Sequence, residues 1–426
     1  MLRKGIYLLG VFLRNRKIFA NHTSLRASEK WPIDELESHQ LARLKVLLLR
    51  AYEESAFYRE KFDQHGVHPS SIRTLQDLAR IPPLSKDELL ANVDRIQLNG
   101  DGEKLFFSET SGSSGTPLVF YRNADWDAWH RASVLRGYDW YGVRPWERNG
   151  YLWGYNISLK RRLKVRLLDA LQNRFRLFSY KDDEINRFAG GLKDATYLEG
   201  YSSMIYEVAK RINRGVGVRP SNLKMVKGTS EKIFPQYQDE VQKAFGRRMI
   251  SEYGAAEAGI IAFECPRGNM HITMETAIVE VENSEVIVTN LASKSFPIIR
   301  YKLGDYVEVD TNTKCACGMV HHVIREVTGR VGRVIRGVEN DYPSLTLYYV
   351  FKNLAIEHNL ILNYRATQRK QGHLKMDIEN RLTPDEKVLL LKECDKYYGR
   401  DLDVEVFDEV DLRSSKKKKL DFVSEL

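Results

Sequence analysis

Short apolar segments alternate with segments of helical periodicity between about residues 148 and 330. The segments "NGYLWGY", "LKMVKGTS" and "RMISEYG" are predicted strands, and "MIYEVAKRINR" and "FPQYQDEVQKAFG" are predicted helices. The stretch "AIVEVENSEVIVTNL" adds a hairpin with its turn near Asn283 and Ser284. Because helices and sheets must cover one another's apolar faces, this alternation predicts a layered α/β body.

The chain before this body is predicted to be helical. Residues 33–65 have helical periodicity, with Pro32 just before the first turn and Gly66 just past the last one. The sequence "IPPLSKDELLANV" predicts a turn followed by a helix that Ser85 caps, with Glu88 three residues later.

The chain after this body has the pattern of a smaller unit. Residues 343–358 are a predicted helix, and "LILNYRATQ" and "HLKMDIE" are predicted strands. The stretch "TPDEKVLLLKECDKYYG" predicts a helix that begins at Thr383 and Pro384 and closes at Gly399, and "DLDVEVF" is a last strand. The fold class is therefore α/β, with a large layered N-terminal domain and a small C-terminal α+β domain.

The composition is that of a soluble globular protein with an anionic partner. A chain of 426 residues, 43% hydrophobic and 29% charged, can form two or three domains. The net charge of +9 favours nucleotides, nucleic acid or an acidic membrane face, although a surplus of lysine that only aids solubility also fits. Basic residues are not interleaved with aromatic ones, which disfavours nucleic acid. Four cysteines do not form a disulfide scaffold, so we expect a cytoplasmic protein.

The N-terminal stretch "MLRKGIYLLGVFLRNRKIFA" has an apolar run from Gly5 to Leu13. This run is too short to span a bilayer, and no small-x-small cleavage site follows it. A basic amphipathic helix on the inner leaflet fits the pattern, and so does a helix packed against the protein body. Peripheral association with the inner membrane therefore stays an open alternative.

The stretch "SETSGSSGTPLVF" is rich in glycine and in hydroxyl side chains. It lacks the lysine of a Walker loop, which excludes a P-loop nucleotidase. Its backbone N–H groups and hydroxyls could still surround phosphate oxygens. Taken alone, the stretch fits a flexible Ser/Gly-rich surface loop better than a phosphate-binding loop.

Two carboxylates stand at positions suited to a nucleotide. In "ISEYGAAEAG" a strand leads to Glu257, where a carboxylate could hold Mg²⁺ against phosphates; a solvated Glu at a helix start is the alternative. In "PIIRYKLGDYVEV" Asp305 follows a predicted turn at Gly304 and could accept both ribose hydroxyls; an ordinary hairpin-turn Asp is the alternative.

A cysteine and histidine cluster predicts a structural Zn²⁺ site. Three thiolates with one imidazole favour tetrahedral zinc, and four protein ligands would close the site. The predicted ligands lie in "ECPRGNMH" and "CACG", and they are Cys265, His271, Cys315 and Cys317.

Glycines at positions 268 and 318 would let the chain turn around the metal. His321 and His322 are further candidates for the fourth ligand, and buried apolar cysteines beside a surface histidine also fit. A nucleophilic role for Cys265 is disfavoured because no base is assigned to it.

Taken together, these stretches resemble the adenylate-forming superfamily of acyl-CoA synthetases, luciferases and peptide synthetases. Three motifs occur in the order of that family. They are the phosphate loop Thr110, Ser111, Gly112, Ser113, Ser114, Gly115, Thr116 and Pro117, the Tyr-Gly motif Tyr253, Gly254, Ala255, Ala256 and Glu257, and the ribose motif Arg300 to Asp305. The stretches "LLLRAYEESAFYREKF" and "YLEGYSSMIYEVAKRI" resemble the branch of phenylacetate–CoA ligases and CapK-like capsule-biosynthesis proteins.

The resemblance implies a domain plan for the chain. Residues 1–100 would be the helical N-terminal part of a large adenylating domain, and residues 101–329 its nucleotide- and acid-binding body, with a zinc-binding insert at 265–317. Residues 330–335 would be a hinge, and residues 336–426 the small C-terminal domain.

The resemblance also implies an ATP-dependent ligase that converts a small carboxylic acid to acyl-AMP and releases pyrophosphate. The acceptor would be CoA, or an amine or hydroxyl of a sugar or carrier, as in capsular or cell-surface polysaccharide biosynthesis. Lys418, with Lys417 as its neighbour, would be catalytic, and Glu257 would hold Mg²⁺. Asp305 and Arg330 would bind the ribose, and Thr110–Thr116 and Tyr253–Ala255 would also bind the nucleotide. The acid pocket would contain Tyr151, Trp153, Tyr155 and Tyr253.

The sequence departs from the family at several positions. Leu118 stands where the family often has a phosphate-binding Lys, and Ala256 replaces a Thr. The hinge sequence Gly329–Arg333 keeps Arg330 but lacks the hinge Asp, and "SSKKKK" offers four lysines where the family has one. These changes keep a third interpretation open, in which a catalytically weakened homologue acts as a binding subunit.

Overall fold

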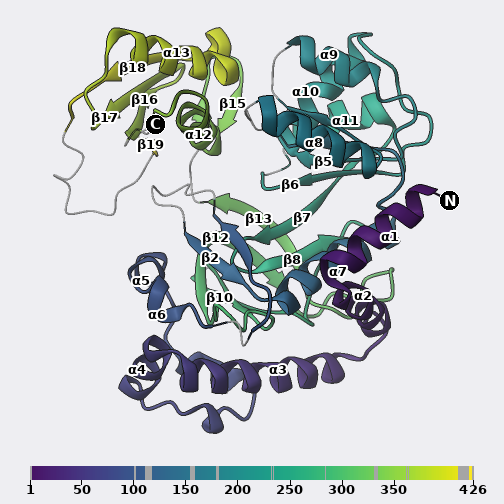
Figure 1. Cartoon of the computed structure of the whole chain (residues 1–426), viewed down its shortest axis with the longest axis vertical. Coiled ribbons are helices and arrows are strands. Elements are labelled where there is room, and N and C mark those ends of the chain that lie inside the picture. Colours follow the sequence, from purple (N-terminus) through teal and green to yellow (C-terminus); the bar gives the residue numbers. More distant parts are fainter. Residues whose placement is uncertain are drawn as a thin grey trace.

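The structure is a computed structural model, and it describes residues 2–99, 102–110, 118–153, 159–178, 182–231, 233, 235–283, 285–330, 334–360, 362, 364–410 and 422–424. Within these residues an 11-stranded mixed sheet forms the centre of the larger part, and a 4-stranded sheet forms the centre of the C-terminal part. Figure 1 shows the C-terminal sheet and its helices at one end of the molecule and the helices α3 and α4 at the other.

The N-terminal helices are α1 (Leu2–Asn15), α2 (Lys17–Ser28), α3 (Ile33–Glu54) and α4 (Ala56–Gln64). The segment 33–65 is thus two helices, where the periodicity predicts one. Ser55 interrupts it with an extended backbone, and its side chain accepts a hydrogen bond from the N–H of Tyr58, so that it caps the second helix.

The next elements are the 3₁₀ turns Pro69–Ser71 and Gln76–Arg80, α5 (Lys86–Ala91), α6 (Val93–Ile96), β1 (Phe106–Glu109), β2 (Val119–Arg122) and α7 (Ala124–Trp140). The cap predicted for α5 is confirmed, since the Ser85 hydroxyl accepts from the N–H of Glu88 at 3.1 Å. Strands β1 and β2 form a separate antiparallel hairpin.

Five strands of the large sheet run parallel to one another: β3 (Asn149–Leu152), β4 (Arg174–Leu177), β5 (Tyr197–Tyr201), β6 (Met225–Thr229) and β7 (Met249–Ala255). The helices between them are α8 (Leu159–Leu171), α9 (Asp182–Gly190), α10 (Ser202–Asn213) and α11 (Pro235–Phe245). The apolar faces of α9, α10 and α11 form one buried core with the strands, as the alternating sequence pattern predicts.

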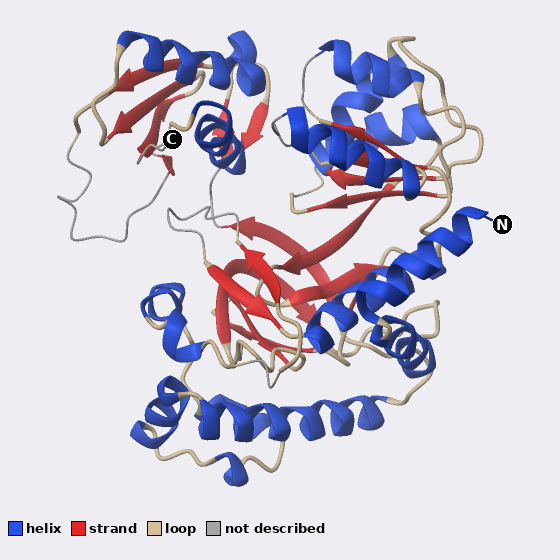
Figure 2. Cartoon of the chain, in the orientation of Figure 1, coloured by secondary structure: helices blue, strands red, loops and turns tan. Residues whose placement is uncertain are grey.

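The remaining strands of this sheet are antiparallel: β8 (Gly259–Glu264), β9 (Met270–Ile272), β10 (Ala277–Glu282), β11 (Glu285–Asn290), β12 (Tyr301–Asp310) and β13 (Val323–Arg330). The predicted hairpin is β10–β11, and Asn283 in its turn has a φ of 50°. Figure 2 shows the long helix α3 alongside these antiparallel strands, and both contribute side chains to the largest core.

The C-terminal part contains β14 (Val334–Arg336), β15 (Asp341–Pro343), α12 (Leu345–His358), β16 (Tyr364–Lys370), β17 (His373–Ile378), α13 (Pro384–Tyr398), the 3₁₀ turn Gly399–Asp401, β18 (Asp403–Phe407) and β19 (Phe422–Ser424). Thr383 and Glu386 form a reciprocal capping box at the start of α13. This part has its own buried core, so the described residues have the predicted α/β fold with a small α+β unit at the C-terminal end.

None of the described helices combines the length and the hydropathy that a transmembrane span requires.

Candidate active site and metal centre

The segment Tyr253–Glu257 lies where the parallel and antiparallel parts of the large sheet meet. Strand β7 is parallel to β6 on one side and antiparallel to β8 on the other. At Gly254 a Cβ atom would lie 2.5 Å from the carbonyl oxygen of Gly259, so the close approach of the two strands requires glycine there.

Glu257 lies in the turn that connects β7 to β8, and not at a helix start. Its side chain is 6% exposed, which also excludes the alternative of a fully solvated carboxylate. The Tyr301 hydroxyl donates to Glu257 Oε1 at 3.4 Å, and the side-chain amide of Asn290 donates to its carbonyl oxygen at 3.0 Å. Two neighbouring antiparallel strands therefore hold the turn that carries this carboxylate.

Asp305 lies within strand β12, so the predicted turn before it is wrong. Gly304 has a φ of 78° but remains inside the strand. Between two consecutive paired positions, β12 contains two more residues than β11, which defines a bulge that includes Gly304 and Asp305. Such bulges redirect side chains next to functional sites.

Residues of different motifs meet at Asp305. The Tyr253 hydroxyl donates to Asp305 Oδ2 at 2.8 Å. Across the sheet, the register of β12 and β13 pairs Asp305 with Arg330. The arrangement thus joins the ends of β7 and β13 to the middle of β12. The side chain of Arg330 lies outside the described part of the chain.

Arg300, the first residue of the ribose motif, has a structural position. Its side chain is 2% exposed and lies 3.0 Å from Glu280 and 2.5 Å from Glu282 of β10. It also donates to the carbonyl oxygen of Ile81, which ties the N-terminal segment to the sheet. The sequence did not reveal this buried ion pair.

The serine-rich loop is closed by the β1–β2 hairpin. The N–H of Thr110 donates to the carbonyl oxygen of Leu118 at 2.9 Å, and the Thr110 hydroxyl accepts from the N–H of Leu118 at 2.9 Å. The Leu118 side chain is 1% exposed, so this position belongs to the core. The loop residues themselves lie outside the described residues: Ser111, Gly112, Ser113, Ser114, Gly115, Thr116 and Pro117.

Other predicted residues also lie outside the described part of the chain. They are the candidate catalytic residues Lys417 and Lys418, the hinge glycine Gly332, and Tyr155 of the acid pocket.

The aromatic residues predicted to form the acid pocket belong to two separate places in the sheet. Tyr151 and Trp153 stack at 6.1 Å, and Trp153 stacks on Tyr201 at 4.6 Å. Tyr253 lies on β7, which is three positions from β3 in the strand order. At the usual spacing of strands this separation is about 14 Å, so Tyr151 and Tyr253 could only line opposite sides of one site.

A buried network of charges crosses the parallel strands, and sequence analysis missed it. Lys227 of β6 lies 2.7 Å from Glu252 of β7 and 3.3 Å from Glu199 of β5. Arg174 of β4 and the hydroxyl of Tyr138 also bind Glu199. The only signal in the sequence is one charged residue in each of three apolar strands, "YLEGY", "MVKGT" and "ISEYG".

The four residues of the predicted zinc site come together, although two pairs of strands and about 50 residues separate them. One ring nitrogen and three sulfur atoms, from Cys265, His271, Cys315 and Cys317, all lie within 4.8 Å of one another. The sulfurs of Cys265 and Cys315 are 3.7 Å apart, and Cys317 Sγ lies 3.2 Å from Nε2 of His271.

Two tight turns supply these cysteines. Gly268 follows Cys265 with a φ of 83°, and its N–H donates to the Cys265 carbonyl at 2.8 Å. Gly318 follows Cys315 and Cys317 with a φ of 90°, and its N–H donates to the Cys315 carbonyl at 3.0 Å. The predicted turns at both glycines are confirmed, and positive φ values favour glycine there.

The pKa values of the three cysteine thiols depend on their burial and on the hydrogen bonds within the cluster. Burial raises the pKa of Cys265 and raises that of Cys317 to about 12. Burial also opposes ionisation of Cys315, but hydrogen bonds from Cys317 and Asn269 outweigh it and lower the pKa of Cys315. Three thiolates this close together need a neutralising cation, and a donor set of three sulfurs and one nitrogen suits Zn²⁺.

His321 is engaged elsewhere, so it is not the fourth ligand. Its Nε2 lies 3.0 Å from Glu275, a buried carboxylate that also binds Arg136 and Ser28. Its carbonyl oxygen accepts from Nδ1 of His271 at 3.2 Å. This contact directs Nε2 of His271 toward the sulfurs, as an outer contact of a metal ligand does. Burial lowers the pKa of His271 to about 4.

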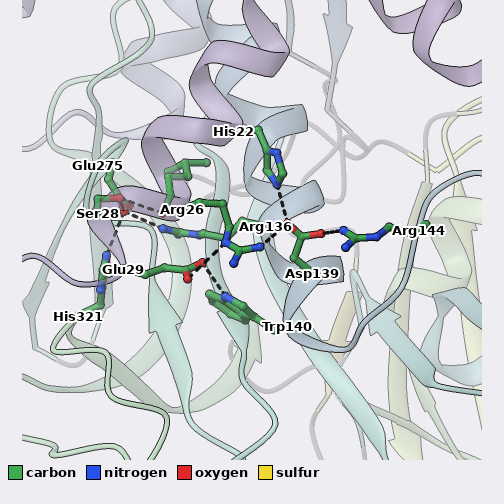
Figure 3. Close-up of polar contacts among 11 residues, drawn as sticks. His22, Arg26, Ser28, Glu29, Arg136, Asp139, Trp140, Arg144, Glu275 and His321 are labelled. Atoms are coloured by element: carbon green, nitrogen blue, oxygen red, sulfur yellow. Dashed lines mark hydrogen bonds and ion pairs between the residues drawn. The ribbon is translucent and has the colours of Figure 1, made fainter.

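Figure 3 shows how this contact continues into a polar network between α2 and α7. Glu275 joins His321 to Arg136 of α7, and Trp140 on the same helix donates to Glu29 at 2.8 Å. Asp139 binds three further basic residues, which are His22, Arg26 and Arg144. The cysteine and histidine cluster is therefore supported by helices from the N-terminal part of the chain.

Comparison with known proteins places this architecture. No family model matches the chain. The protein CapK of Staphylococcus aureus is 25% identical over 355 residues, which cover 72% of this chain and 76% of CapK. Phenylacetate-coenzyme A ligase of Escherichia coli (strain K12) is 25% identical over 380 residues, which cover 83% of this chain and 84% of the ligase.

Among solved structures, 2-hydroxyisobutyryl-CoA ligase in complex with 2-HIB-AMP and CoA aligns with a TM-score of 0.65. The alignment covers 93% of this chain and 91% of that chain at 18% identity, which supports the fold alone. The chain is therefore a homologue of the phenylacetate–CoA ligases and CapK, and it has the fold of the adenylate-forming acyl-CoA ligases.

Proposed function

We propose that the protein is an ATP-dependent ligase that activates a carboxylic acid as acyl-AMP, releases pyrophosphate and transfers the acyl group to an acceptor. The observation that carries this proposal is the meeting of the motifs at Asp305, which accepts from Tyr253 at 2.8 Å and is paired with Arg330 across the sheet. The homology to phenylacetate-coenzyme A ligase and CapK supports the same reaction class.

In the first half-reaction a carboxylate oxygen of the acid bonds to the α-phosphorus of ATP. The bond from this phosphorus to the bridging oxygen breaks, and pyrophosphate leaves with its electron pair. No general base is required, because a carboxylic acid is ionised at neutral pH. The work of the protein is therefore to align two anions and to neutralise their repulsion.

Asp305 and Arg330 would fix the ribose in this reaction. A carboxylate can accept hydrogen bonds from both ribose hydroxyls, and the Tyr253 hydroxyl holds one of its oxygens in place. Because Asp305 lies on a strand and not on a loop, its position is set by the sheet.

Glu257 would hold Mg²⁺ against the phosphates. Magnesium binds one or two carboxylates together with phosphate oxygens, and the carboxylate of Glu257 is supported by Tyr301 in a turn beside the ribose site. When bound, the ion would neutralise charge on the departing pyrophosphate. Thr110–Thr116 would surround the β- and γ-phosphates, and Lys418, with Lys417 beside it, would bridge the acid and the α-phosphate.

We propose that Tyr151, Trp153, Tyr155 and Tyr253 line the acid pocket. The stacked pair Tyr151–Trp153 supports an aromatic wall on the β3 side, and Arg174 and Arg176 lie 4.1 and 4.3 Å from the Tyr151 ring. These cation–π contacts hold the Tyr151 ring, while the charges of the two arginines are paired with Glu199 and Asp169.

The acceptor would be CoA or an amine or hydroxyl of a saccharide or carrier. Phenylacetate-coenzyme A ligase supports the first, and CapK supports a role in polysaccharide biosynthesis. In both cases the acceptor atom bonds to the acyl carbon and AMP leaves. A rotation of residues 336–426 about the segment 330–335 would place each acceptor at the acyl group, and this domain plan is part of the proposal.

We also propose that Cys265, His271, Cys315 and Cys317 hold a structural Zn²⁺ ion. All four protein ligands are supplied, so no position remains for a substrate. The ion would lock the turns after β8 and before β13 against each other, which orients both strands toward the nucleotide site.

Finally, we propose that the enzyme is cytoplasmic and associates with the inner membrane through α1. The apolar side chains Leu2, Leu9 and Leu13 of this helix are 78%, 59% and 74% exposed. A lipid-linked carrier would be accessible to an enzyme held at that surface.

The experiment that tests the function is ATP–pyrophosphate exchange with purified, zinc-loaded protein and a panel of aromatic, aliphatic and sugar acids. Exchange with one class of acid is expected. Adding CoA and searching for the thioester by mass spectrometry then separates a CoA ligase from a transferase that uses another acceptor. Binding of ATP without exchange for any acid would instead favour the weakened homologue that acts as a binding subunit.

A further inference from the structure

Helix α8 exposes leucines along one face. Leu163, Leu167 and Leu171 are 67%, 64% and 45% exposed, and their spacing of four residues places them on the same side of the helix. Leu168 beside them is 46% exposed. A helix that covers a sheet normally turns such residues inward, so this face has no partner within the described residues.

The inner face of α8 is fixed by an ion pair. Asp169 is buried, and Arg176 of β4 donates to both of its oxygens at 2.8 Å. Asp169 is two residues from Leu167 and from Leu171, about 200° around the helix axis. The buried pair therefore holds the leucines on the solvent side.

Helix α1 has the same construction. Leu2, Leu9, Phe12 and Leu13 are exposed, whereas Tyr7 packs its ring 5.9 Å from Trp146. At the end of the helix Arg14 lies 2.9 Å from the buried carboxylate of Asp127. These two contacts attach α1 to the body by one face and leave its leucines outside.

The two helices contact each other, and Figure 1 shows them on the same side of the molecule. Of the 21 exposed large apolar side chains among the described residues, four lie on α1 and four on α8. Monomeric soluble proteins rarely expose so many large apolar side chains on two neighbouring helices.

Charge identifies what covers these leucines. Residues 1–17 contain five basic residues and no acidic one, and residues 159–171 contain five basic residues and one acidic residue, the buried Asp169. A second copy of the chain would place its ten basic residues from these segments against the ten of the first copy, and like charges repel. An anionic bilayer supplies both the apolar phase for the leucines and the headgroups for Lys and Arg.

We infer that α1 and α8 together form one leucine-lined, basic surface that binds an anionic lipid bilayer. The membrane contact through α1 is part of the proposed function, and this inference rests on it. It adds α8 as a second contacting helix and a requirement for anionic lipid. Neither helix spans the bilayer; both lie in its interface.

The first test is co-sedimentation of the full-length protein with phosphatidylcholine vesicles, with and without phosphatidylglycerol. Binding is expected only with the anionic lipid, and added salt should weaken it because the charges act across water. Equal binding to both kinds of vesicle, or to neither, would overturn the inference.

The second test compares three pairs of substitutions. Leu163→Glu with Leu167→Glu changes α8, Leu9→Glu with Leu13→Glu changes α1, and Val388→Glu with Leu391→Glu changes the exposed face of α13 as a control. Each of the first two pairs should lower the apparent partition coefficient about tenfold or more, because each removes two leucines and adds two negative charges. The control pair should bind as the unchanged chain does.

Vesicle binding that survives the α8 pair but not the α1 pair would show that α8 is not part of the surface. Light scattering on the same proteins tests the other occupant: a doubled mass that the α8 pair abolishes would assign the face to a second copy and contradict the inference. Binding to an RNA homopolymer that competes with the vesicles would assign it to nucleic acid.

ATP–pyrophosphate exchange measured without vesicles tests the proposed ligase activity independently of membrane binding. The α8 pair should retain the exchange rate and circular dichroism of the unchanged chain, since its leucines are exposed. A chain that binds anionic vesicles but shows no exchange would leave the surface intact and overturn the proposed ligase.

Discussion

Asp305 is the residue at which the predicted nucleotide site is best defined. It lies in a bulge of β12, it accepts from Tyr253, and it is paired with Arg330 on β13. The hydroxyl donor belongs to the Tyr-Gly motif and the paired Arg330 to the hinge sequence, so residues of three different sequence stretches meet here. A single substitution at this residue therefore tests the whole assembly.

We predict that Asp305→Asn raises the KM for ATP about tenfold to a hundredfold, because hydrogen bonds to a charged acceptor contribute about 1.5–3 kcal/mol. The measurement is the initial rate of exchange against ATP concentration. Asp310→Asn is the matched control, since Asp310 lies on the same strand and binds the exposed Arg325. An unchanged KM in Asp305→Asn would remove this residue from the ribose site.

Cys265 is one of four clustered side chains that together would make a zinc ligand set, so its loss should have an effect beyond its own packing. We predict that Cys265→Ser lowers the zinc content of the purified protein and the free energy of unfolding by about 3 kcal/mol or more. Elemental analysis and urea unfolding measure the two effects. Cys394→Ser in the core of α13 is the control and should keep the metal; a zinc content near zero in the unchanged chain would contradict the site.

His130 provides a prediction for pH. Burial, together with Arg122 and Arg131, lowers the pKa of its imidazole to about 3. The unfolded chain therefore binds one more proton than the folded chain between about pH 6.5 and pH 3, and stability falls as the pH is lowered through this range.

We expect His130→Gln to reduce the slope of unfolding free energy against pH by about one proton between pH 4 and 6. The control is His358→Gln, at an exposed position at the end of α12. An unchanged slope in His130→Gln would mean that the imidazole is not held neutral in the folded protein.

At the scale of elements, strands β5, β6 and β7 are held by the buried charges Glu199, Lys227 and Glu252 as well as by apolar packing. Burial opposes the charged form of each group, but the pKa of Lys227 is raised and that of Glu199 is lowered because the opposite charges adjoin them. The contribution of Glu199 is lost as the pH falls through its folded pKa, and that of Lys227 as the pH rises through its own. This network positions the strand that leads into Tyr253.

We predict that Lys227→Met destabilises the protein by about 3–5 kcal/mol, because it leaves two buried carboxylates without their cation. Lys224→Met is the matched control: Lys224 is 43% exposed in its ion pair with Glu147, and we expect a change of about 0–1 kcal/mol. Chemical unfolding of both variants measures the difference. Equal effects would show that the network does not hold the strands.

The elements that the sequence predicts well are those whose signal is local. The caps at Ser85 and Thr383 and the β10–β11 hairpin follow from neighbouring residues, and the structure confirms them. The cluster of three cysteines and one histidine could also be predicted from the sequence, because few metals suit three thiolates and an imidazole.

What the sequence could not predict depends on contacts between distant strands. The bulge at Asp305 arises from the register of β12 against β11, and a glycine before an aspartate reads as a turn when the neighbouring strand is unknown. The helix break at Ser55 has apolar periodicity on both sides, so only the backbone reveals it. The charges at Glu199 and Lys227 become a network only once the parallel register is fixed.

At the scale of the whole molecule, we expect that an oxygen of the acid attacks the α-phosphorus of ATP. The fold, the assembly of motifs around Asp305 and the homology to phenylacetate-coenzyme A ligase and CapK all support that chemistry. The cluster of Cys265, His271, Cys315 and Cys317 lies beside strands of the same sheet.

The most direct measurement labels the acid with oxygen-18 in its carboxylate and follows the label by mass spectrometry after acyl transfer to CoA or to hydroxylamine. We predict AMP that carries one labelled oxygen, because the oxygen that attacks phosphorus remains on the nucleotide when the acyl carbon is transferred. The label in inorganic phosphate, with ADP as the nucleotide product, would instead reveal an acyl phosphate and contradict the adenylate mechanism.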